Sequence, residues 1–277
     1  MVLDTSNLPI VLCADDYAQS AGVSAAVCQL ARAGALSATS AMTLSPRWRE
    51  DAAPLRELRG RLDVGLHLDF TSGFARAAGC GLSLGAAMRR ALLGGWDRGA
   101  AREAIARQLD AFEAAWQAPP DHVDGHQHVQ QFAGIREPLV ELLARRYGPR
   151  PPWLRISRPP AGQAGAKGWL IARMGADALA SLAAAHGLPH SQWLTGIYDF
   201  QGGAAAYAHR MANWLAQAPA GAVLMCHPAA GADEGGDPIA SARQWELAHL
   251  SSPAFAAQCT AAGVRIVRGS DLYSSTQ

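Results

Sequence analysis

The sequence alternates short apolar runs with longer segments of helical periodicity from one end to the other. The run at 11–14 precedes a helical pattern over 23–33, and the run at 35–44 precedes another over 48–58. This alternation favours parallel strands joined by crossover helices, because parallel neighbours need a long connection between them. No obvious linker divides the chain. We therefore predict an α/β fold in which residues 1–277 form a single domain.

The rest of the chain continues the same pattern, and at this length we expect a (β/α) barrel, closed or distorted, rather than an open sheet. The segment Thr71–Gly99 interrupts it with Gly- and Ala-rich sequence, which fits a mobile lid and a structural insertion with a short helix equally well. Further strands are predicted at 61–70, after Pro120, at 153–157, at 221–227 and at 264–269, and further helices at 101–116, 135–146, 170–186, 207–218 and 252–262.

Composition excludes several classes of protein. The formal net charge is +1 and charged residues make up 17% of the chain, so nothing indicates binding to nucleic acid. No apolar run reaches the roughly 18 residues of a membrane span. The N-terminal residues lack the basic and apolar regions of a signal peptide. The five cysteines form no C-x-x-C pair. We expect reduced thiols and a cytoplasmic location.

Two adjacent carboxylates, Asp15 and Asp16, follow the first apolar run in the stretch "VLCADDYAQS". Like charges this close repel each other, and the repulsion grows as the dielectric constant falls. Either aspartate alone could simply cap the helical pattern that follows. Side by side at the end of a buried strand, they lead us to expect a bound cation nearby. If strand alternation holds, the two side chains point to opposite faces and serve different purposes.

Other polar residues stand at later predicted strand ends. A lone strand histidine is more often a hydrogen-bonded core residue than a ligand, but carboxyl ends of parallel strands meet at one rim of a barrel. If the strand continues, the two histidines of "DGHQH" share one face. One Asp with two His is a set that binds divalent metals and leaves positions open for water and substrate. The residues concerned are His67, Asp124, His126, His128 and His227.

The chain resembles the YdjC-like carbohydrate deacetylases, a family that includes chitooligosaccharide and hopanoid-associated deacetylases. The resemblance rests on "ADDYAQSAGVSAAVCQLARAGALSATSAM", "VGLHLDFT", "VDGHQHV", "LRISRP" and "MCHPA", in that order along nearly the whole chain. Three positions depart from the family pattern. Tyr17 stands where a phenylalanine is usual, which is a mild change, and Ala18 stands where a glycine is usual. Gln130 stands where a further histidine is usual, which predicts an altered contact on the substrate side. "RQWEL" (243–247) is similar to a late Arg-x-x-Glu-Leu stretch.

The resemblance implies a polysaccharide-deacetylase-like distorted barrel, often a homodimer, with one divalent metal ion. It assigns metal binding to Asp16, His67 and His126. Asp15 would be the general base, His227 the general acid, and Arg155 would orient Asp15. His128 and Asp124 would support the ligands or contact substrate. The donor types suit Zn²⁺, Co²⁺ or Mn²⁺, and relatives are also associated with Mg²⁺.

The implied reaction is hydrolysis of an N-acetyl group on a mono- or oligosaccharide or a glycolipid. A metal would activate water, Asp15 would take the water proton, and His227 would protonate the leaving amine. Two alternatives stay open: an amidohydrolase or phosphoesterase acting on a non-sugar substrate, and a non-catalytic relative that binds metal or glycan. The basic residues do not cluster near the motifs, which disfavours phosphoester chemistry. The presence of both Asp15 and His227 disfavours a non-catalytic relative.

Overall fold

A parallel eight-stranded sheet forms the centre of the molecule. The computed structural model describes residues 8–163, 165–231 and 235–273. The strand order is β5-β4-β3-β2-β1-β7-β6, and β8 pairs with β1. The strands are β1 Leu8–Tyr17, β2 Ala38–Ala41, β3 Asp63–Leu68, β4 His122–Gly125, β5 Trp153–Leu154, β6 Leu194–Thr195, β7 Val223–Cys226 and β8 Val264–Ile266.

The first strand organises the sheet. β1 pairs with β2 on one side and with β7 on the other, while its first residues pair with β8. The segment Ile10–Ala14 is almost entirely buried, as a run of apolar residues covered on both faces of a parallel sheet should be. Cys13 and Cys226 lie in this core, as expected of small buried thiols. The aspartates that follow are thereby carried to the carboxyl rim of the sheet.

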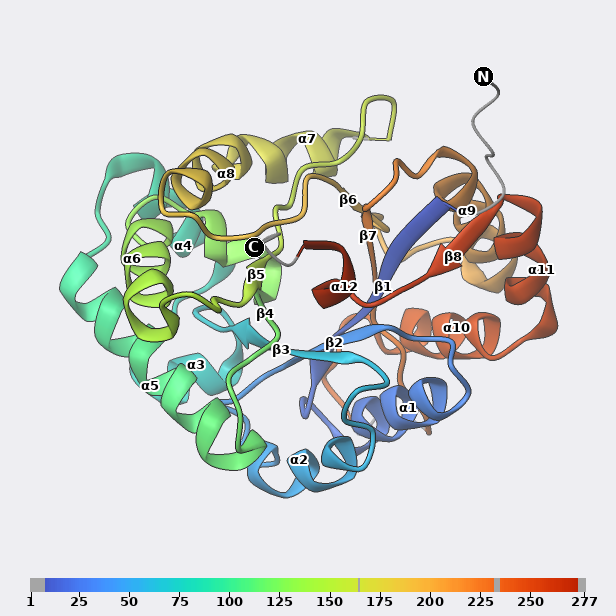
Figure 1. Cartoon of the computed structure of the whole chain (residues 1–277), viewed down its shortest axis with the longest axis horizontal. Coiled ribbons are helices and arrows are strands. Elements are labelled where there is room, and N and C mark those ends of the chain that lie inside the picture. Colours follow the sequence, from blue (N-terminus) through green and yellow to red (C-terminus); the bar gives the residue numbers. More distant parts are fainter. Residues whose placement is uncertain (1–7, 164, 232–234, 274–277) are drawn as a thin grey trace.

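Helices surround the strands, and Figure 1 shows them as an incomplete ring around the curved sheet. The predicted α/β fold with a distorted barrel is confirmed as a half-barrel within one domain. The helices are α1 Ala21–Arg32, α2 Trp48–Arg56, α3 Gly73–Ala77, α4 Leu84–Leu93, α5 Arg98–Trp116, the 3₁₀ turn η1 His126–Gln131, α6 Arg136–Tyr147, α7 Gly165–Arg173, α8 Ala176–Ala185, α9 Gly203–Gln217, α10 Ala240–Leu250, α11 Pro253–Ala261 and α12 Ser270–Tyr273.

One predicted helix is wrong in its extent. The pattern at 170–186 is divided between α7 and α8, with Gly175 at the junction. Gly175 has a φ of 129°, and a Cβ there would lie 2.3 Å from the carbonyl oxygen of Gln131. Only glycine fits such a close approach with that backbone angle. The sequence pattern also missed α10 and the short strand β6.

The segment 71–99 contains α3 and α4 and packs on the barrel through Phe70 and Trp96, whose rings make an edge contact at 5.4 Å. That this segment is a moving lid stays a prediction.

Among the described residues, no helix combines the length and apolar character needed to cross a bilayer.

Candidate active site

The chain turns sharply where β1 ends. Asp16 and Ala18 have φ values of 66° and 69°, in the left-handed region that favours glycine. The register of β1 with β2 also shifts between Ala14 and Tyr17. The regular alternation of side chains along the strand therefore stops at the two aspartates. The backbone of the turn sets the directions of their side chains. The glycine that is usual at position 18 of the family pattern has a physical reason, because this position requires a left-handed backbone.

Asp15 forms a buried ion pair with Arg155. Its two carboxylate oxygens lie 2.6 and 2.8 Å from the two terminal nitrogens of Arg155, and one of these nitrogens is also 2.9 Å from Asp124. All three side chains are buried. Burial alone would raise the pKa of Asp15, but the guanidinium of Arg155 holds it below its ordinary value. Asp15 is therefore a carboxylate at neutral pH.

Asp16 is paired with a different arginine, Arg243 of α10, at 2.7 Å. Burial would raise the pKa of Asp16, but Arg243 and His126 hold it well below its ordinary value. Part of the positive charge that the adjacent aspartates led us to expect is thus supplied by two arginines, one for each carboxylate. This corrects the sequence-based reasoning, which found no basic residues clustered near the motifs.

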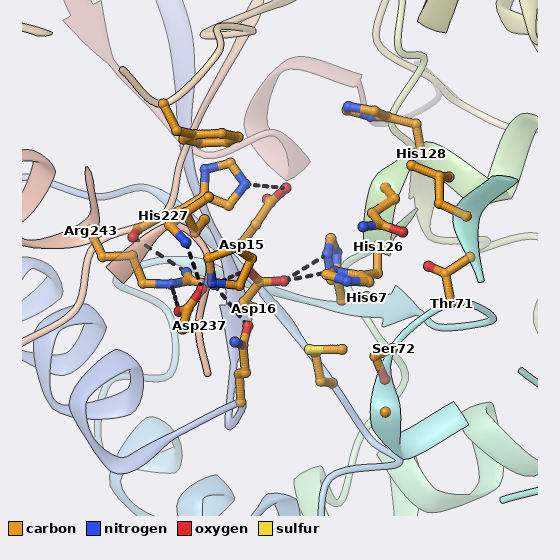
Figure 2. A pocket seen from close by; sticks show the side chains of 18 of the residues that line it. Asp15, Asp16, His67, Thr71, Ser72, His126, His128, His227, Asp237 and Arg243 are labelled. Carbon is orange, nitrogen blue, oxygen red and sulfur yellow. Dashed lines mark hydrogen bonds and ion pairs between the residues drawn. The ribbon is translucent and has the colours of Figure 1, made fainter. Parts of the chain in front are cut away.

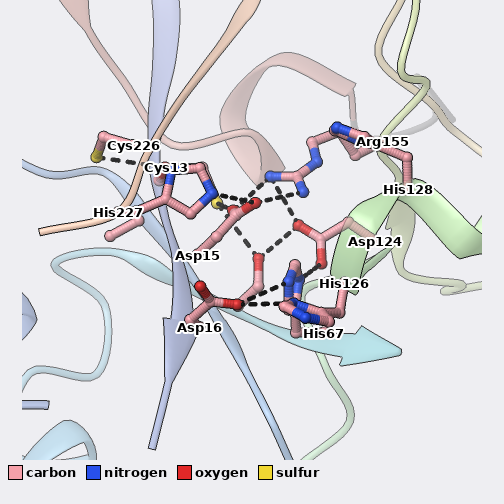
Figure 3. Close-up of polar contacts among 12 residues, drawn as sticks. Cys13, Asp15, Asp16, His67, Asp124, His126, His128, Arg155, Cys226 and His227 are labelled. Atoms are coloured by element: carbon pink, nitrogen blue, oxygen red, sulfur yellow. Dashed lines mark hydrogen bonds and ion pairs between the residues drawn. The ribbon is translucent and has the colours of Figure 1, made fainter. Parts of the chain in front are cut away.

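The other oxygen of Asp16 faces two imidazoles (Figure 3). Its Oδ1 lies 3.3 Å from Nε2 of His67 and 3.0 Å from Nδ1 of His126, and the three candidate ligand atoms lie within 4.8 Å of one another. Ligand atoms about 2.0–2.2 Å from one tetrahedral metal stand roughly 3.3–3.6 Å apart. The donor types and spacings therefore fit a single divalent cation.

Asp124 holds the ring of His67 in an orientation suited to metal binding. Its Nδ1 lies 2.6 Å from the carboxylate of Asp124, which leaves Nε2 directed at Asp16. A carboxylate behind a ligating imidazole fixes its ring and tautomer. Burial would lower the pKa of His67, but Asp124 and Asp15 raise it to about 10 when only protein groups surround it. The negative potential that retains this proton also favours a metal cation.

The expectation that His126 and His128 share a strand face is wrong. β4 ends at Gly125, and the chain enters the tight turn η1, in which Gln127 and His128 have φ values of 54° and 62°. The turn sends His126 to Asp16 and His128 to the hydroxyl of Ser157, 3.0 Å away. Burial and Arg155 lower the pKa of His128 to about 3, so it is a neutral group.

Gln130 is also not where the sequence placed it. Its side chain is buried and donates from Nε2 to the carbonyl of Arg155 and to the hydroxyl of Ser157, both at 3.0 Å. It does not line the pocket. The residue fixes the turn η1 to the segment after β5, and the altered contact on the substrate side stays a prediction.

His227 lies on the opposite side of the aspartates from His67 and His126, as Figures 2 and 3 show. Its Nε2 is 3.9 Å from Asp15, and its ring makes an edge contact with Phe200 at 5.2 Å. Burial lowers the pKa of His227 to about 4, although Asp15 and Asp16 act in the other direction. The group is a neutral imidazole at pH 7.

Two buried residues of α10 were not predicted as site residues. Arg243 pairs with Asp16, and Glu246 accepts a hydrogen bond from the backbone N–H of His227 at 2.5 Å. Burial raises the pKa of Glu246 to about 7. The only sequence signal for them was the similarity of "RQWEL" to a family stretch. All eight predicted site residues, in contrast, lie in this one cluster or contact it (Figures 2 and 3).

A cavity of about 850 Å³ opens above the cluster. Its floor is polar, with both aspartates and the histidines His67, His126, His128 and His227. Its walls are largely apolar and come partly from the segment 71–99 and partly from α7. Wall residues include Phe74, Leu84, Met88, Leu170, Ile171 and Met174. A concave apolar cavity with a few convergent polar groups is the usual form of a small-molecule site.

Comparison with known proteins shows which family the chain belongs to. The family model described as YdjC-like protein matches residues 9–261. The chain belongs to the YdjC-like family. The predicted resemblance is thereby confirmed. Among curated members, a carbohydrate deacetylase of Mus musculus is 33% identical over 202 residues, which are 62% of this chain and 62% of the mouse protein. The matched part thus spans less than two thirds of that relative.

Solved structures show the same fold as this YdjC-like chain. A candidate cellobiose-phosphate cleavage protein of Enterococcus faecalis V583 has a TM-score of 0.73 at 18% identity, covering 97% of this chain and 100% of that one. The Bc1960 peptidoglycan N-acetylglucosamine deacetylase has a TM-score of 0.51 at 11% identity, covering 98% and 91%. These identities are too low to carry over function, but they confirm the polysaccharide-deacetylase-like barrel.

Proposed function

We propose that the chain is a metal-dependent hydrolase that removes an N-acetyl group from an amino-sugar substrate. The observation that carries the proposal is the convergence of Asp16, His67 and His126 on one point, with Asp15 and His227 beside it at the floor of the cavity. The mouse relative's name supports a carbohydrate as substrate. The apolar walls fit a substrate that buries more than hydroxyl groups, which includes glycolipids as well as oligosaccharides.

Asp16, His67 and His126 would hold one divalent cation, Zn²⁺ or Mg²⁺, with Co²⁺ and Mn²⁺ as further candidates. When bound, such an ion lowers the pKa of a water molecule and polarises an acyl oxygen. Arg243 occupies the second oxygen of Asp16, so one oxygen is left for the ion. Asp124 fixes His67 from behind, and His126 remains partly exposed towards the cavity.

Asp15 would act as the general base. It is ionised at neutral pH because Arg155 lowers its pKa, and it lies at the cavity floor next to the candidate ligand Asp16. Arg155 binds both of its oxygens and so fixes the direction of the carboxylate. A carboxylate held in this way can accept a proton from an attacking water without first reorienting.

His227 would deliver a proton to the nitrogen that leaves when the amide bond breaks. Since its pKa is about 4, the imidazole does not carry a second proton at pH 7 and must receive one during the reaction. The nearest source is Asp15, 3.9 Å from Nε2. The proton that Asp15 accepts from water therefore has a short route through His227 to the leaving amine.

The alternative of phosphoester hydrolysis is less well supported. Arg155 and Arg243 donate to Asp15, Asp124 and Asp16, so they neutralise carboxylates instead of facing a phosphate. Two further basic residues that line the cavity, Arg76 and Lys167, each donate to a backbone carbonyl. An amide substrate without a sugar is an outcome of the experiment below. A homodimer and a cytoplasmic location stay predictions from the family resemblance and the composition.

Acetate release from a panel of N-acetylated sugars and glycolipids, with defined metals, tests the proposal. We expect Asp15→Asn to lose at least about 100-fold in rate, the lower range of general-base effects, with its metal content unchanged. Asp177→Asn is the matched control, because Asp177 lies on α8 with its side chain 89% exposed. Equal release by wild type and Asp15→Asn would remove Asp15 as base. Release only from non-sugar amides would reassign the substrate.

A further inference from the structure

Two residues of α10 support the site from one side, and the proposed mechanism uses only the contact of one of them, Arg243, with Asp16. Arg243 and Glu246 are three positions apart, so they project from the same face of the helix. Both are buried. Figure 2 shows Arg243 lying against Asp16, Asp237 and His227. They are the first and fourth residues of the stretch "RQWEL".

Arg243 binds one carboxylate oxygen of Asp16, and the other oxygen is directed at the histidines. One terminal nitrogen lies 2.7 Å from Oδ2 of Asp16 and 2.8 Å from the side-chain oxygen of Gln19, while Nε lies 2.5 Å from Asp237. With Oδ2 bound to Arg243, it is Oδ1 that faces His67 and His126. The planar guanidinium is itself fixed by Asp237 and by the carbonyl of His227, so the nitrogen that binds Oδ2 has one defined position, which a single point charge would lack.

His227 is held by its main chain. Its N–H donates to Glu246 at 2.5 Å, and its carbonyl accepts from Arg243 at 3.4 Å. Glu246 is itself fixed by the hydroxyl of Tyr198, 2.6 Å away. Within the described part of the chain, Nδ1 of His227 has no hydrogen-bond partner. A catalytic imidazole is commonly oriented by a bond to its second nitrogen. No residue of the described ranges makes such a bond to His227.

We propose that Arg243 and Glu246 are a pair of positioning residues, the α10 pair, which set the metal ligand Asp16 and the proton donor His227 relative to each other. Arg243 acts on the carboxylate of Asp16, and Glu246 acts on the peptide group of His227. The imidazole then needs only its main-chain anchor and the contact with Phe200 to keep its place. The inference rests on the proposed function for the role of His227, whereas the effect of Arg243 on metal binding does not.

The two residues should affect different observables, which a merely structural role would not produce. Loosening Asp16 weakens metal binding, and changes behind a metal ligand typically cost about 10–100-fold in affinity or activity. Loosening His227 leaves the metal ligands in place but slows proton delivery. The first change is read by metal affinity alone, and the second by kcat at saturating metal.

The test compares Arg243→Lys, Arg243→Gln and Glu246→Gln with Ser241→Ala, a control at an exposed position of the same helix. Zn²⁺ alone is titrated against a chromophoric chelator, and kcat and KM are measured at saturating Zn²⁺. We expect both Arg243 variants to bind Zn²⁺ about 10–100-fold more weakly. Glu246→Gln should keep its Zn²⁺ affinity within about twofold and its KM within about threefold, with kcat at least about 10-fold lower. Ser241→Ala should match wild type in every measurement.

Variants that change only the melting temperature, with Zn²⁺ affinity and kcat as in wild type, would overturn the proposal. Unfolding of all three substitutions would also overturn it, because it would assign the pair to stability alone. If wild type binds Zn²⁺ but hydrolyses none of the substrates, the proposed function fails while the Zn²⁺ titration still decides the role of Arg243.

Discussion

Buried aspartates stand at both ends of the barrel strands, and they are bonded in different ways. Asp63, at the start of β3, accepts hydrogen bonds from the indole of Trp153 and from the N–H and hydroxyl of Ser270, at 2.6–3.0 Å. Asp16, at the end of β1, turns one oxygen to Arg243 and the other to two imidazole nitrogens. The first carboxylate is surrounded by neutral donors, and the second by groups that can bind or move charge.

The comparison shows that hydrogen-bond partners, more than burial, separate a structural carboxylate from a functional one. Asp63 connects the start of β3 to β5 and to α12, at the end of the barrel where the strands begin. Asp16, Asp15 and Asp124 are equally buried, but they hold two arginines and converge on His67. In the sequence, Asp63 and His67 are both simply polar interruptions of one apolar strand. The three predictions that follow would break or sharpen this contrast.

Metal removal should have the largest effect, and only at the rim. Dialysis against a chelator should abolish acetate release, and a divalent metal should restore it. A metal present at 100 times its dissociation constant contributes about 2.7 kcal/mol to stability. That should raise the melting temperature by roughly 5–10 °C in a chain of this size. A chelated protein that keeps its activity and its melting temperature would contradict the assignment of a metal site to the carboxyl rim of the sheet.

Substitution of Asp63 should affect stability but leave the site intact. Asp63→Asn weakens bonds at a buried carboxylate and should cost about 1–3 kcal/mol, or roughly 2–10 °C in melting temperature. Metal affinity and kcat of the folded protein should stay within about twofold of wild type. Asp16→Asn, measured in parallel, should lose metal affinity and kcat, and its melting temperature should no longer rise when metal is added. Loss of metal binding in Asp63→Asn would show that the two ends of the barrel strands do not act independently.

The smallest effect is a difference in pH dependence between the two ends. Burial and nearby Asp63 raise the pKa of Asp121 to about 6, whereas Arg155 lowers the pKa values of Asp15 and Asp124. Between the ordinary value of about 3.9 and about 6, folded Asp121 keeps a proton that the unfolded chain has released, so stability falls as pH rises. The rim carboxylates act with the opposite sign: their contribution is present above the ordinary value and is lost on acidification below it.

Urea unfolding at pH 4.5 and pH 6.5 measures this difference. Other groups titrate in the same range, including His128 and His227, so the test is the difference between variant and wild type. Asp121→Asn should make the change in unfolding free energy from pH 4.5 to pH 6.5 more positive than it is in wild type. The matched measurement is Asp177→Asn, whose exposed carboxylate should leave the slope as it is in wild type. A slope that Asp121→Asn leaves unchanged would show that burial near Asp63 does not perturb this group.

Much of the fold and most of the site follow from the sequence for a simple physical reason. Apolar runs such as 11–14 form buried parallel strands, and the carboxyl ends of such strands meet at one rim. Asp15, Asp16, His67 and His227 could therefore be grouped before their distances were known. Which aspartate would face the histidines could not, because the left-handed backbone of Asp16 ends the strand alternation.

The parts that the sequence did not predict depend on local backbone angles or on distant partners. η1 separates His126 from His128 through positive φ values, which an H-x-H spacing does not reveal. Gly175 divides α7 from α8 because of a contact with Gln131, more than forty residues away in the chain. Arg243 meets Asp16 across 227 positions, and no periodic pattern indicates such a pair.

X-ray diffraction from crystals soaked in Zn²⁺, with anomalous data at the zinc edge, tests the central claim most directly. The account predicts one strong peak about 2.0–2.2 Å from Oδ1 of Asp16, Nε2 of His67 and Nδ1 of His126. Two other groups of metal-binding type occur among the described residues: Cys13, His122 and Asp124, and Asp15, His67 and Asp124. A peak at either of them would contradict the account, as would the absence of any peak at Asp16.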